Sequence, residues 1–191
     1  MPGIRPIEFD RQAALDAVVE AFWSGGFAGT NLTGLVEATG VARQSLYNTF
    51  GDKRSMFLAA LRRYSEERLA RHASALDGDP AMDRLIAFVE TWRHRRARSS
   101  GRGCLISLAM GEVGQADPAV AEVAAHHARG LADLMAASLQ RAGVEATSAR
   151  RLAGSLVTTS FGIATLARQR GTDEQIEAAT ETAVAMLWAS A

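Results

Sequence analysis

The most chemically specific stretch of the sequence is GVARQSLYNTFGDK, residues 40–53. Its polar side chains hydrogen-bond in defined directions: Arg43, Gln44, Ser45, Tyr47 and Asn48. Arginine pairs bidentately with guanine and glutamine with adenine, while serine reaches either a base or a phosphate. Lys53, the only lysine of the chain, follows directly. These residue types are suited to contacts with the edges of base pairs and with the phosphates beside them.

The residues around this stretch predict a helix-turn-helix. One short helix ends at Gly40, where a left-handed residue costs little, and a second covers roughly residues 43–50. Leu46 and Phe50 are four residues apart and are expected to face inward, which leaves the polar side chains outward. In this motif the second helix enters the major groove. Lys53 then begins the next helix, where its charge, the free backbone amides and the helix dipole converge on one phosphate.

Two less specific interpretations stay open at this point. The formal net charge is zero, so the chain has no overall basic signature. Short helix pairs also occur as plain structure, in which case residues 43–50 form a surface helix and the lysine is incidental. A helical protein-interaction module is a further alternative, although it leaves the polar residues of this stretch without a purpose.

Composition indicates an ordinary globular protein of one or two small domains. The chain has 191 residues, of which 48% are hydrophobic and 22% are charged. No apolar run approaches the ~20 residues that cross a bilayer, and the N-terminal residues 1–6 lack the apolar core of a signal peptide. A single cysteine, Cys104, fits a reducing compartment. We therefore expect a cytoplasmic protein without a cofactor.

Nearly every segment has helical periodicity, which predicts an all-α fold of about nine helices. Helix starts are predicted at Asp10, Thr30 or Asn31, Asp52, Pro80, Asp117 and Thr172, the last as a capping box with Gln175. The arginine-rich run at residues 93–102 is expected to be a solvated helix end. His126 and His127 are adjacent and point about 100° apart on a helix, so they make a poor chelating pair, and no metal site is predicted.

Residues 27–61, FAGTNLTGLVEATGVARQSLYNTFGDKRSMFLAAL, resemble the N-terminal domain of the TetR family of transcriptional repressors. The matching features are Gly26-Phe27, Gly40-Val41, Leu46-Tyr47, Phe50 and Lys53. The resemblance implies a DNA-binding domain at residues 8–68 and a ligand-binding and dimerisation domain at 69–191. It also implies a homodimer that binds a palindromic operator in double-stranded DNA and is released by a small molecule.

The resemblance also assigns roles to individual residues. By position, Arg43, Gln44, Ser45 and Asn48 read bases or nearby phosphates, while Tyr47, Lys53 and either Thr30 or Thr33 hold the DNA backbone. The chain departs from the family pattern at Ala42, where Ser or Thr commonly caps the helix, and at Asn48, where His is common. The missing cap costs about 1 kcal/mol.

Small residues at four-residue spacing mark one face of each of the last two helices. Such faces let a second helix approach closely across a two-fold axis. The alternative is ordinary packing within one domain, but the resemblance favours a four-helix dimer interface. The expected interface residues are Gly154, Thr158, Gly162, Thr165, Ala178, Thr182 and Ala185.

The middle of the chain is expected to enclose a ligand cavity, as the resemblance implies. Its large adaptable side chains are suited to an apolar or aromatic ligand, and no charged selector stands out among them. An uncharged hydrophobic inducer is therefore expected. The expected lining residues are Phe88, Trp92, Cys104, Leu108, Met110, Met135 and Phe161.

Cys104 has three possible interpretations. A buried cysteine is most often a small hydrophobic residue. However, the segment GRGCLISLAM, residues 101–110, resembles the corresponding part of TetR-type repressors that respond to reactive electrophiles, which makes a thiol sensor the alternative. Cys104 paired with a histidine as nucleophile and base is a third, enzymatic reading. Nothing in the sequence supplies an oxyanion hole, phosphate loop or metal cluster, so we do not expect an enzyme.

Overall fold

The computed structural model describes residues 9–190, and all of its regular elements are helices. The N-terminal segment and the expected domain limits at residues 8 and 191 lie outside the described residues. Nine helices have eight or more residues, as predicted: α1 Arg11–Gly29, α2 Leu32–Thr39, α3 Arg43–Phe50, α4 Lys53–Leu76, α5 Ala81–Glu90, α7 Leu105–Glu112, α8 Pro118–Arg141, α9 Ala146–Leu166 and α10 Asp173–Trp188. Two single turns, η1 Thr91–His94 and α6 Arg95–Arg98, complete the set.

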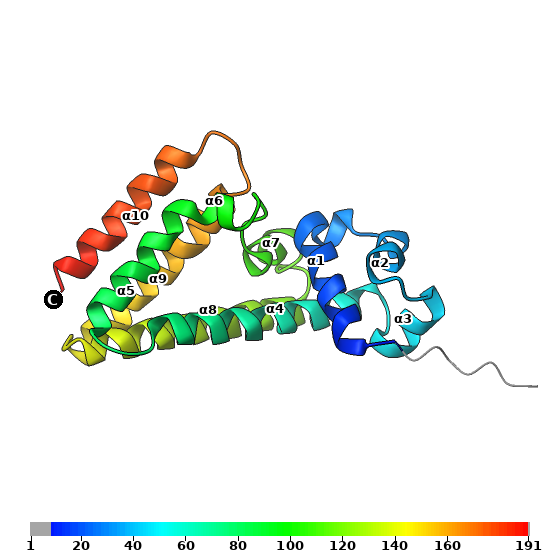
Figure 1. Cartoon of the computed structure of the whole chain (residues 1–191), viewed down its shortest axis with the longest axis horizontal. Coiled ribbons are helices and arrows are strands. Elements are labelled where there is room, and N and C mark those ends of the chain that lie inside the picture. Colours follow the sequence, from blue (N-terminus) through cyan, green and yellow to red (C-terminus); the bar gives the residue numbers. More distant parts are fainter. Residues whose placement is uncertain (1–8, 191) are drawn as a thin grey trace, which may run out of the picture.

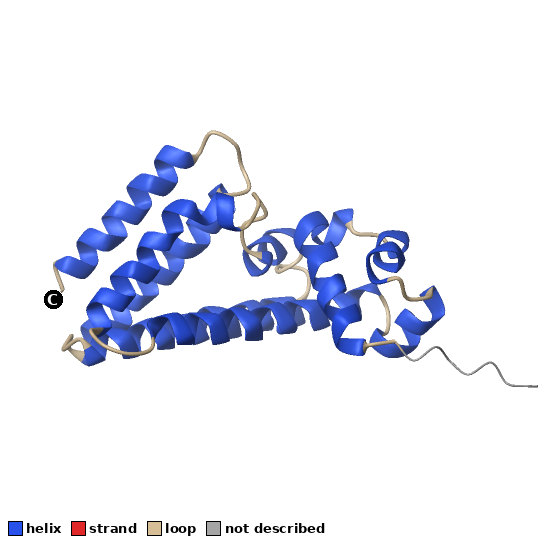
Figure 2. Cartoon of the chain, viewed as in Figure 1, coloured by secondary structure: helices blue, strands red, loops and turns tan. Residues whose placement is uncertain are grey.

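The helices form two parts joined by a long spine (Figures 1 and 2). Helices α1–α3 form a compact group at one end, and α4 leads from this group along α8 to the opposite end. Helices α5, α9 and α10 slope back above the spine. Within residues 9–190, no helix is long and apolar enough to cross a membrane.

Side-chain caps begin most of the helices, as the sequence predicts. The carboxylates of Asp10, Asp52 and Asp117 accept hydrogen bonds from backbone amides of α1, α4 and α8, and Asn31 does the same for α2. The predicted capping box of α10 is wrong. The Thr172 hydroxyl donates to the Leu166 carbonyl at 2.8 Å and makes no cap bond, because it closes the preceding turn instead.

The hydrophobic core crosses the boundary expected between the two domains. Cys104, Leu105 and Ile106 at the start of α7 are at most 3% exposed and belong to the same cluster as the buried residues of α1–α3. A second cluster fills the space among α5, α8, α9 and α10. Helix α7 therefore packs against the N-terminal helices and connects their core to the rest of the molecule.

Polar contacts reinforce this junction. Gly26 kinks α1 with φ 68°, and a Cβ at this position would collide with the carboxylate of Glu112 on α7. That carboxylate accepts a hydrogen bond from the Phe27 amide at 2.6 Å. Arg54 near the start of α4 donates two hydrogen bonds to Asp117, at 2.6 and 2.8 Å. These contacts join α7 to α1 and the start of α8 to the start of α4.

Candidate DNA-binding surface and ligand cavity

Helix α3 presents its polar side chains to solvent, as predicted. Leu46 is fully buried and anchors the helix, while Phe50 is half-buried against the same core. Gly40, with φ 66°, makes the turn between α2 and α3. The exposed residues of α3 are Arg43, Gln44, Tyr47 and Asn48, and Ser45 is half-buried. This geometry leaves one continuous polar face on the second helix of a helix-turn-helix.

Contacts within α3 hold this face in order. The Gln44 amide donates to Asn48 Oδ1 at 3.0 Å, one turn further along. The guanidinium of Arg43 lies 5.9 Å from the centre of the Tyr47 ring. Ala42 gives α3 no side-chain cap, so the first amides of the helix have no side-chain acceptor there. Free amides at a helix start are the groups that bind a phosphate.

Lys53 is the first residue of α4 and lies over the Phe27 ring, with Nζ 4.5 Å from the ring centre. The two threonines that the resemblance leaves open differ in exposure. Thr33 is exposed, whereas Thr30 is 6% exposed and its hydroxyl donates to the Ala21 carbonyl at 3.3 Å. Of the two, Thr33 is the one whose hydroxyl is free to meet a DNA backbone.

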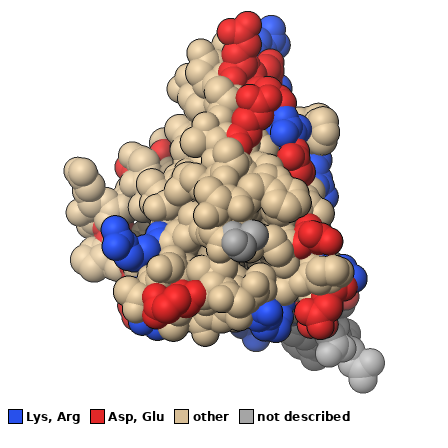
Figure 3. All heavy atoms as spheres, turned by 90° about the vertical axis from the view of Figure 1, so that its left-hand side faces the viewer, with Lys and Arg blue, Asp and Glu red and all other residues tan. Residues whose placement is uncertain are grey.

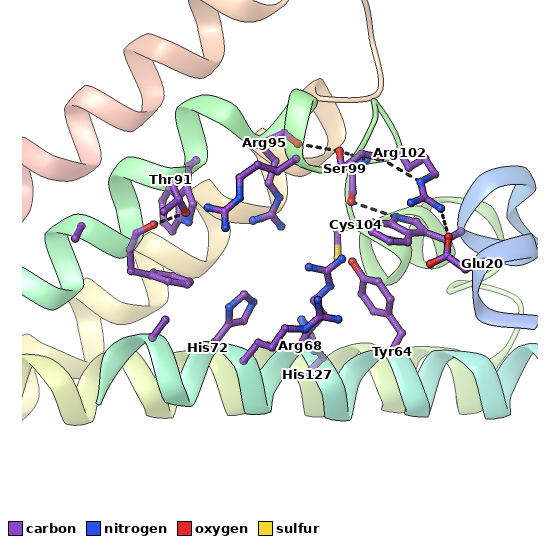
Figure 4. A pocket seen from close by; sticks show the side chains of 18 of the residues that line it. Glu20, Tyr64, Arg68, His72, Thr91, Arg95, Ser99, Arg102, Cys104 and His127 are labelled. Atoms are coloured by element: carbon purple, nitrogen blue, oxygen red, sulfur yellow. Dashed lines mark hydrogen bonds and ion pairs between the residues drawn. The ribbon is translucent and has the colours of Figure 1, made fainter. Parts of the chain in front are cut away.

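A cavity of about 660 Å³ lies between the spine and the segment that follows α5 (Figure 4). Tyr64, Arg68 and His72 reach it from α4, and Arg95 and Cys104 reach it from the opposite wall. Helix α1 also contributes to the wall. The full lining is Glu20, Trp23, Tyr64, Arg68, Arg71, His72, Ala75, Arg84, Ala87, Phe88, Thr91, Trp92, Arg95, Arg98, Ser99, Arg102, Gly103, Cys104 and His127.

Three of the seven expected lining residues, Phe88, Trp92 and Cys104, line this cavity. The other four, Leu108, Met110, Met135 and Phe161, do not. Met110 is 47% exposed on the outer side of α7, and Met135 is fully buried in the core between helices. Large apolar side chains fill the core in this fold, so their presence in the sequence does not locate the cavity.

The cavity also corrects the expectation that no charged group would select a ligand. Six arginines line it, and three of them, Arg95, Arg98 and Arg102, come from the run that was expected to be a solvated helix end. The run folds into η1, α6 and a short loop. The chain turns at this point, so that some of its arginines face the cavity. The many arginines in residues 93–102 were the sequence signal for a positively charged cavity. Which of these arginines face the cavity depends on the turn, which is a property of the tertiary structure.

The pKa values of the titratable groups in the cavity are consistent with its many arginines. Burial, and after it the positive charge of Arg95, lowers the pKa of His72 to about 3 and that of His127 to about 4. His127 Nδ1 lies 3.0 Å from the Ser65 hydroxyl. Burial also raises the pKa of Tyr64, and the neighbouring Cys104 thiol raises it further. Both histidines are therefore neutral at neutral pH, and arginine supplies the positive charge of the cavity.

The seven residues expected at a dimer interface are all exposed on the single chain. A Cβ added at Gly154 or Gly162 would meet nothing within 4 Å. The hydroxyls of Thr158 and Thr182 donate to carbonyls of their own helices. Met186 and Trp188 add apolar exposure on α10, and charged side chains are sparse over much of the end of the molecule seen in Figure 3.

Metal-ligating side chains do not gather in the described part of the chain. No group of three His, Cys, Asp or Glu residues there has the geometry to hold an ion. His126 is exposed while its neighbour His127 is buried, so the two rings do not converge.

Two family models match the sequence. Residues 14–60 match "Bacterial regulatory proteins, tetR family", and residues 81–182 match "Transcriptional regulator LmrA/YxaF-like, C-terminal domain". The second match alone spans more than half of the 191 residues. The protein belongs to the TetR family. It is thus a DNA-binding transcriptional regulator, and the first match contains every residue that the sequence assigned to DNA contacts.

Individual TetR-family relatives extend the likeness over most of the chain. The uncharacterized HTH-type transcriptional regulator YezE of Bacillus subtilis (strain 168) is 32% identical over 137 residues, which are 71% of each protein. The HTH-type transcriptional repressor ComR of Escherichia coli (strain K12) is 44% identical over 72 residues, only 38% of this chain and 34% of ComR. The chain thus spans about a third of that relative.

Solved structures show the same fold over nearly the full length. A cysteine mutant of the TetR-family regulator CifR, complexed with a 26-bp double-strand operator, has a TM-score of 0.78 and 29% identity, covering 95% of this chain and 98% of CifR. A TetR regulator from Chloroflexus aurantiacus has a TM-score of 0.81 at 24% identity, with 93% of each chain covered. The reduced form of E. coli NemR has a TM-score of 0.73 at 20% identity, over 93% of this chain and 94% of NemR.

Proposed function

We propose that this TetR-family regulator is a repressor that binds a palindromic operator as a homodimer and releases it when a small molecule occupies the cavity. The observation that carries the proposal is the composition of the cavity wall. Glu20 and Trp23 belong to α1, which packs on α2, the first helix of the DNA-reading pair, and they line the same cavity as residues of α4, α5 and α8. A ligand there touches the DNA-binding part itself.

On the operator, α3 is proposed to enter the major groove. Arg43, Gln44, Ser45 and Asn48 then contact base edges or nearby phosphates, while Tyr47 and Lys53 contact the backbone. Thr33 of α2 is the third backbone contact, in preference to the buried Thr30. The first two residues of α3 carry the donors most suited to guanine and adenine, so they are expected to determine base preference.

A dimer is required for a palindromic site, since one α3 reads only one half. The exposed small-residue faces of α9 and α10 are proposed to pair with their copies as a four-helix interface. A palindromic operator requires the two α3 helices to lie one turn of duplex apart, about 34–36 Å, or further if the half-sites are spaced more widely. CifR, a regulator of the same fold, is known in complex with a 26-bp double-strand operator, which supports operator binding by this chain.

Release follows from two states of the junction between α1 and the ligand-binding part. At this junction, Glu20 pairs with Arg102, and Trp23 Nε1 donates to the Gly103 carbonyl at 3.2 Å. A ligand that binds Arg102 in place of Glu20, or that displaces the loop containing Gly103, favours a different position of α1. In that position the distance between the two α3 helices no longer matches the operator. A coupling of about 1–3 kcal/mol lowers operator affinity roughly 5- to 150-fold.

Selection of DNA fragments on the purified protein, followed by sequencing of the retained pool, tests the proposal. We expect one shared inverted repeat, retained by wild type and lost with Tyr47→Ala. A matched variant on the outer side of α8, Arg129→Ala, should retain the same fragments, because this exposed arginine lies far along the chain from α3. A pool without a common repeat, from protein refolded free of ligand, contradicts the proposal.

Electrophile sensing by Cys104 is a second candidate, and one observation favours it. The residue is 3% exposed, yet it lines the cavity, so a small electrophile that enters the cavity meets it without reaching bulk solvent. Alkylation would join the sulfur to the electrophilic carbon and add bulk beside Tyr64. If wild type loses operator binding after treatment with N-ethylmaleimide while Cys104→Ser keeps it, this candidate is supported. Equal responses of the two proteins eliminate it.

A further inference from the structure

The ligand cavity contains far more positive than negative charge. Its lining includes six arginines, Arg68, Arg71, Arg84, Arg95, Arg98 and Arg102, but only one acidic residue, Glu20. Glu20 pairs with Arg102. Charges that face a cavity are costly unless something compensates them. Arg71 also pairs with a carboxylate, that of Glu67 at 3.4 Å. Within residues 9–190, the other four guanidinium groups have no carboxylate partner.

The run at residues 93–102 shows that this imbalance is confined to the cavity. Arg93 and Arg96 turn away from the cavity toward α10 and meet acidic residues there, Arg93 with Glu177 and Arg96 with Asp173 at 2.8 Å. Their neighbours Arg95 and Arg98 line the cavity, and no carboxylate within residues 9–190 pairs with either of them. Acidic partners are thus present on one side of the same short segment and absent on the other.

Two buried donors of the lining also lack acceptors. Arg68 Nε and Trp92 Nε1 are buried and make no hydrogen bond in the described part of the chain, and Trp92 is 1% exposed. A buried donor without a partner costs about 1–3 kcal/mol, so such donors usually mark a missing acceptor. Both residues line the cavity, and an oxyanion bound there would satisfy and neutralise Arg68.

The walls hold the arginines in place and add an apolar surface. The guanidinium groups of Arg102 and Arg68 lie 3.9 and 4.9 Å from the centre of the Trp23 ring, and Arg68 lies 5.0 Å from that of Tyr64. Such stacking fixes a planar guanidinium and leaves its edge donors available. The rings of Phe88 and Trp92 line the other part of the cavity. A volume of about 660 Å³ is far larger than an inorganic ion and suits an organic molecule.

We propose that the cavity binds an organic oxyanion, a carboxylate or comparable acidic head group attached to an aromatic or other flat apolar body. The inference rests on the proposed function, because it names the chemical class of the ligand that releases the operator. The head group lies among Arg68, Arg95 and Arg98, where bidentate pairing with guanidinium is available. The apolar body lies against Phe88 and Trp92. Neutral His72 and His127 add polar edges without competing for the anion.

Calorimetric titration of the intact dimer with matched acids and amides tests the class directly. The probes are 2-naphthoate, 4-biphenylcarboxylate, their uncharged amides and inorganic phosphate. We expect at least one carboxylate to bind about tenfold or more tightly than its amide, the factor that one charge-assisted hydrogen bond supplies, and phosphate to bind more weakly than that carboxylate. If neither carboxylate exceeds its amide, the inference is overturned.

Variants locate the binding site. Arg68→Gln and Arg98→Gln should each reduce the preference for acid over amide about tenfold, and the exposed control Arg129→Gln should leave it unchanged. Arg98 is exposed at the rim, so its replacement preserves the fold even where loss of the stacked Arg68 disturbs it. If both single variants fold and each keeps the wild-type preference for acid over amide, the anion binds elsewhere and the inference is contradicted.

The same proteins separate this inference from the proposed function. If the selected operator is bound but carboxylate and amide bind equally, the anion inference fails while the repressor stands. If a carboxylate binds with the expected preference but leaves operator affinity unchanged, the ligand class is correct and release through this cavity is wrong.

Discussion

Replacing Lys53 with glutamine removes one positive charge from the first turn of α4 and retains most of the side-chain length. No carboxylate of the described chain pairs with Lys53, whose ammonium group lies over the Phe27 ring 4.5 Å from its centre. Its charge is therefore available to a phosphate. Each neutralised phosphate contributes a slope of about −0.9 to the dependence of log affinity on log salt concentration.

The size of the effect follows from the dimer. Two copies of Lys53 contact two phosphates, so the variant should reduce the magnitude of the salt slope by about 1.8. Between 50 and 200 mM salt, the affinity advantage of wild type over Lys53→Gln should shrink about twelvefold. Fluorescence anisotropy of the selected operator fragment, titrated with protein at four salt concentrations, measures both slopes.

Two controls make the result specific. Arg129→Gln removes an exposed cation from α8, a helix outside the helix-turn-helix, and should leave the slope unchanged. Thermal unfolding of Lys53→Gln should show only the loss of a cation–π contact, about 0.5–1 kcal/mol. An identical slope for wild type and Lys53→Gln in a folded protein would refute the assignment of Lys53 to a phosphate.

Further substitutions test other parts of the structure. Leu46→Ala empties a fully buried anchor of α3; it should destabilise the protein by about 2–5 kcal/mol in urea unfolding, and an unfolding curve equal to wild type would contradict the packing described here. Gly162→Leu adds bulk to the exposed face of α9 and should convert the dimer to monomers in sedimentation, while an intact dimer would remove this face from the interface. The hydrogen bonds from Arg54 hold the pKa of Asp117 below its usual value of 3.8, so their stabilisation is present above that pH and is lost as the pH falls below it. Acid unfolding of Arg54→Gln should accordingly depend less steeply on pH below about 4 than that of wild type, and equal curves would contradict this linkage.

The sequence predicted the helix-turn-helix well because its determinants are local. Gly40 requires the left-handed turn, Asp52 caps α4, and the spacing of Leu46 and Phe50 sets the buried side of α3. These features depend on residues within one or two turns of each other. The exposed small-residue faces of α9 and α10 were predicted for the same reason, since a four-residue repeat has one orientation on a helix.

The cavity was predicted less well because it depends on contacts between distant segments. Glu20 and Trp23 reach it from the N-terminal helices, and nothing near them in the sequence indicates that they meet Arg102. Residues 93–102 carry an arginine at nearly every second position, but only the turn through η1 and α6 decides which ones face inward. Apolar residues such as Met135 were expected to line the cavity but lie in the hydrophobic core. The sequence does not separate the two, because a core and an apolar cavity have the same composition.

Hydroxyl-radical footprinting of the selected operator is the measurement that bears on the whole proposal. If the protein is a dimeric repressor that reads DNA with α3, wild type protects two symmetric half-sites about one helical turn apart or more widely spaced, and Tyr47→Ala loses both together. A single protected site without symmetry, or a footprint that Tyr47→Ala leaves unchanged, would contradict it.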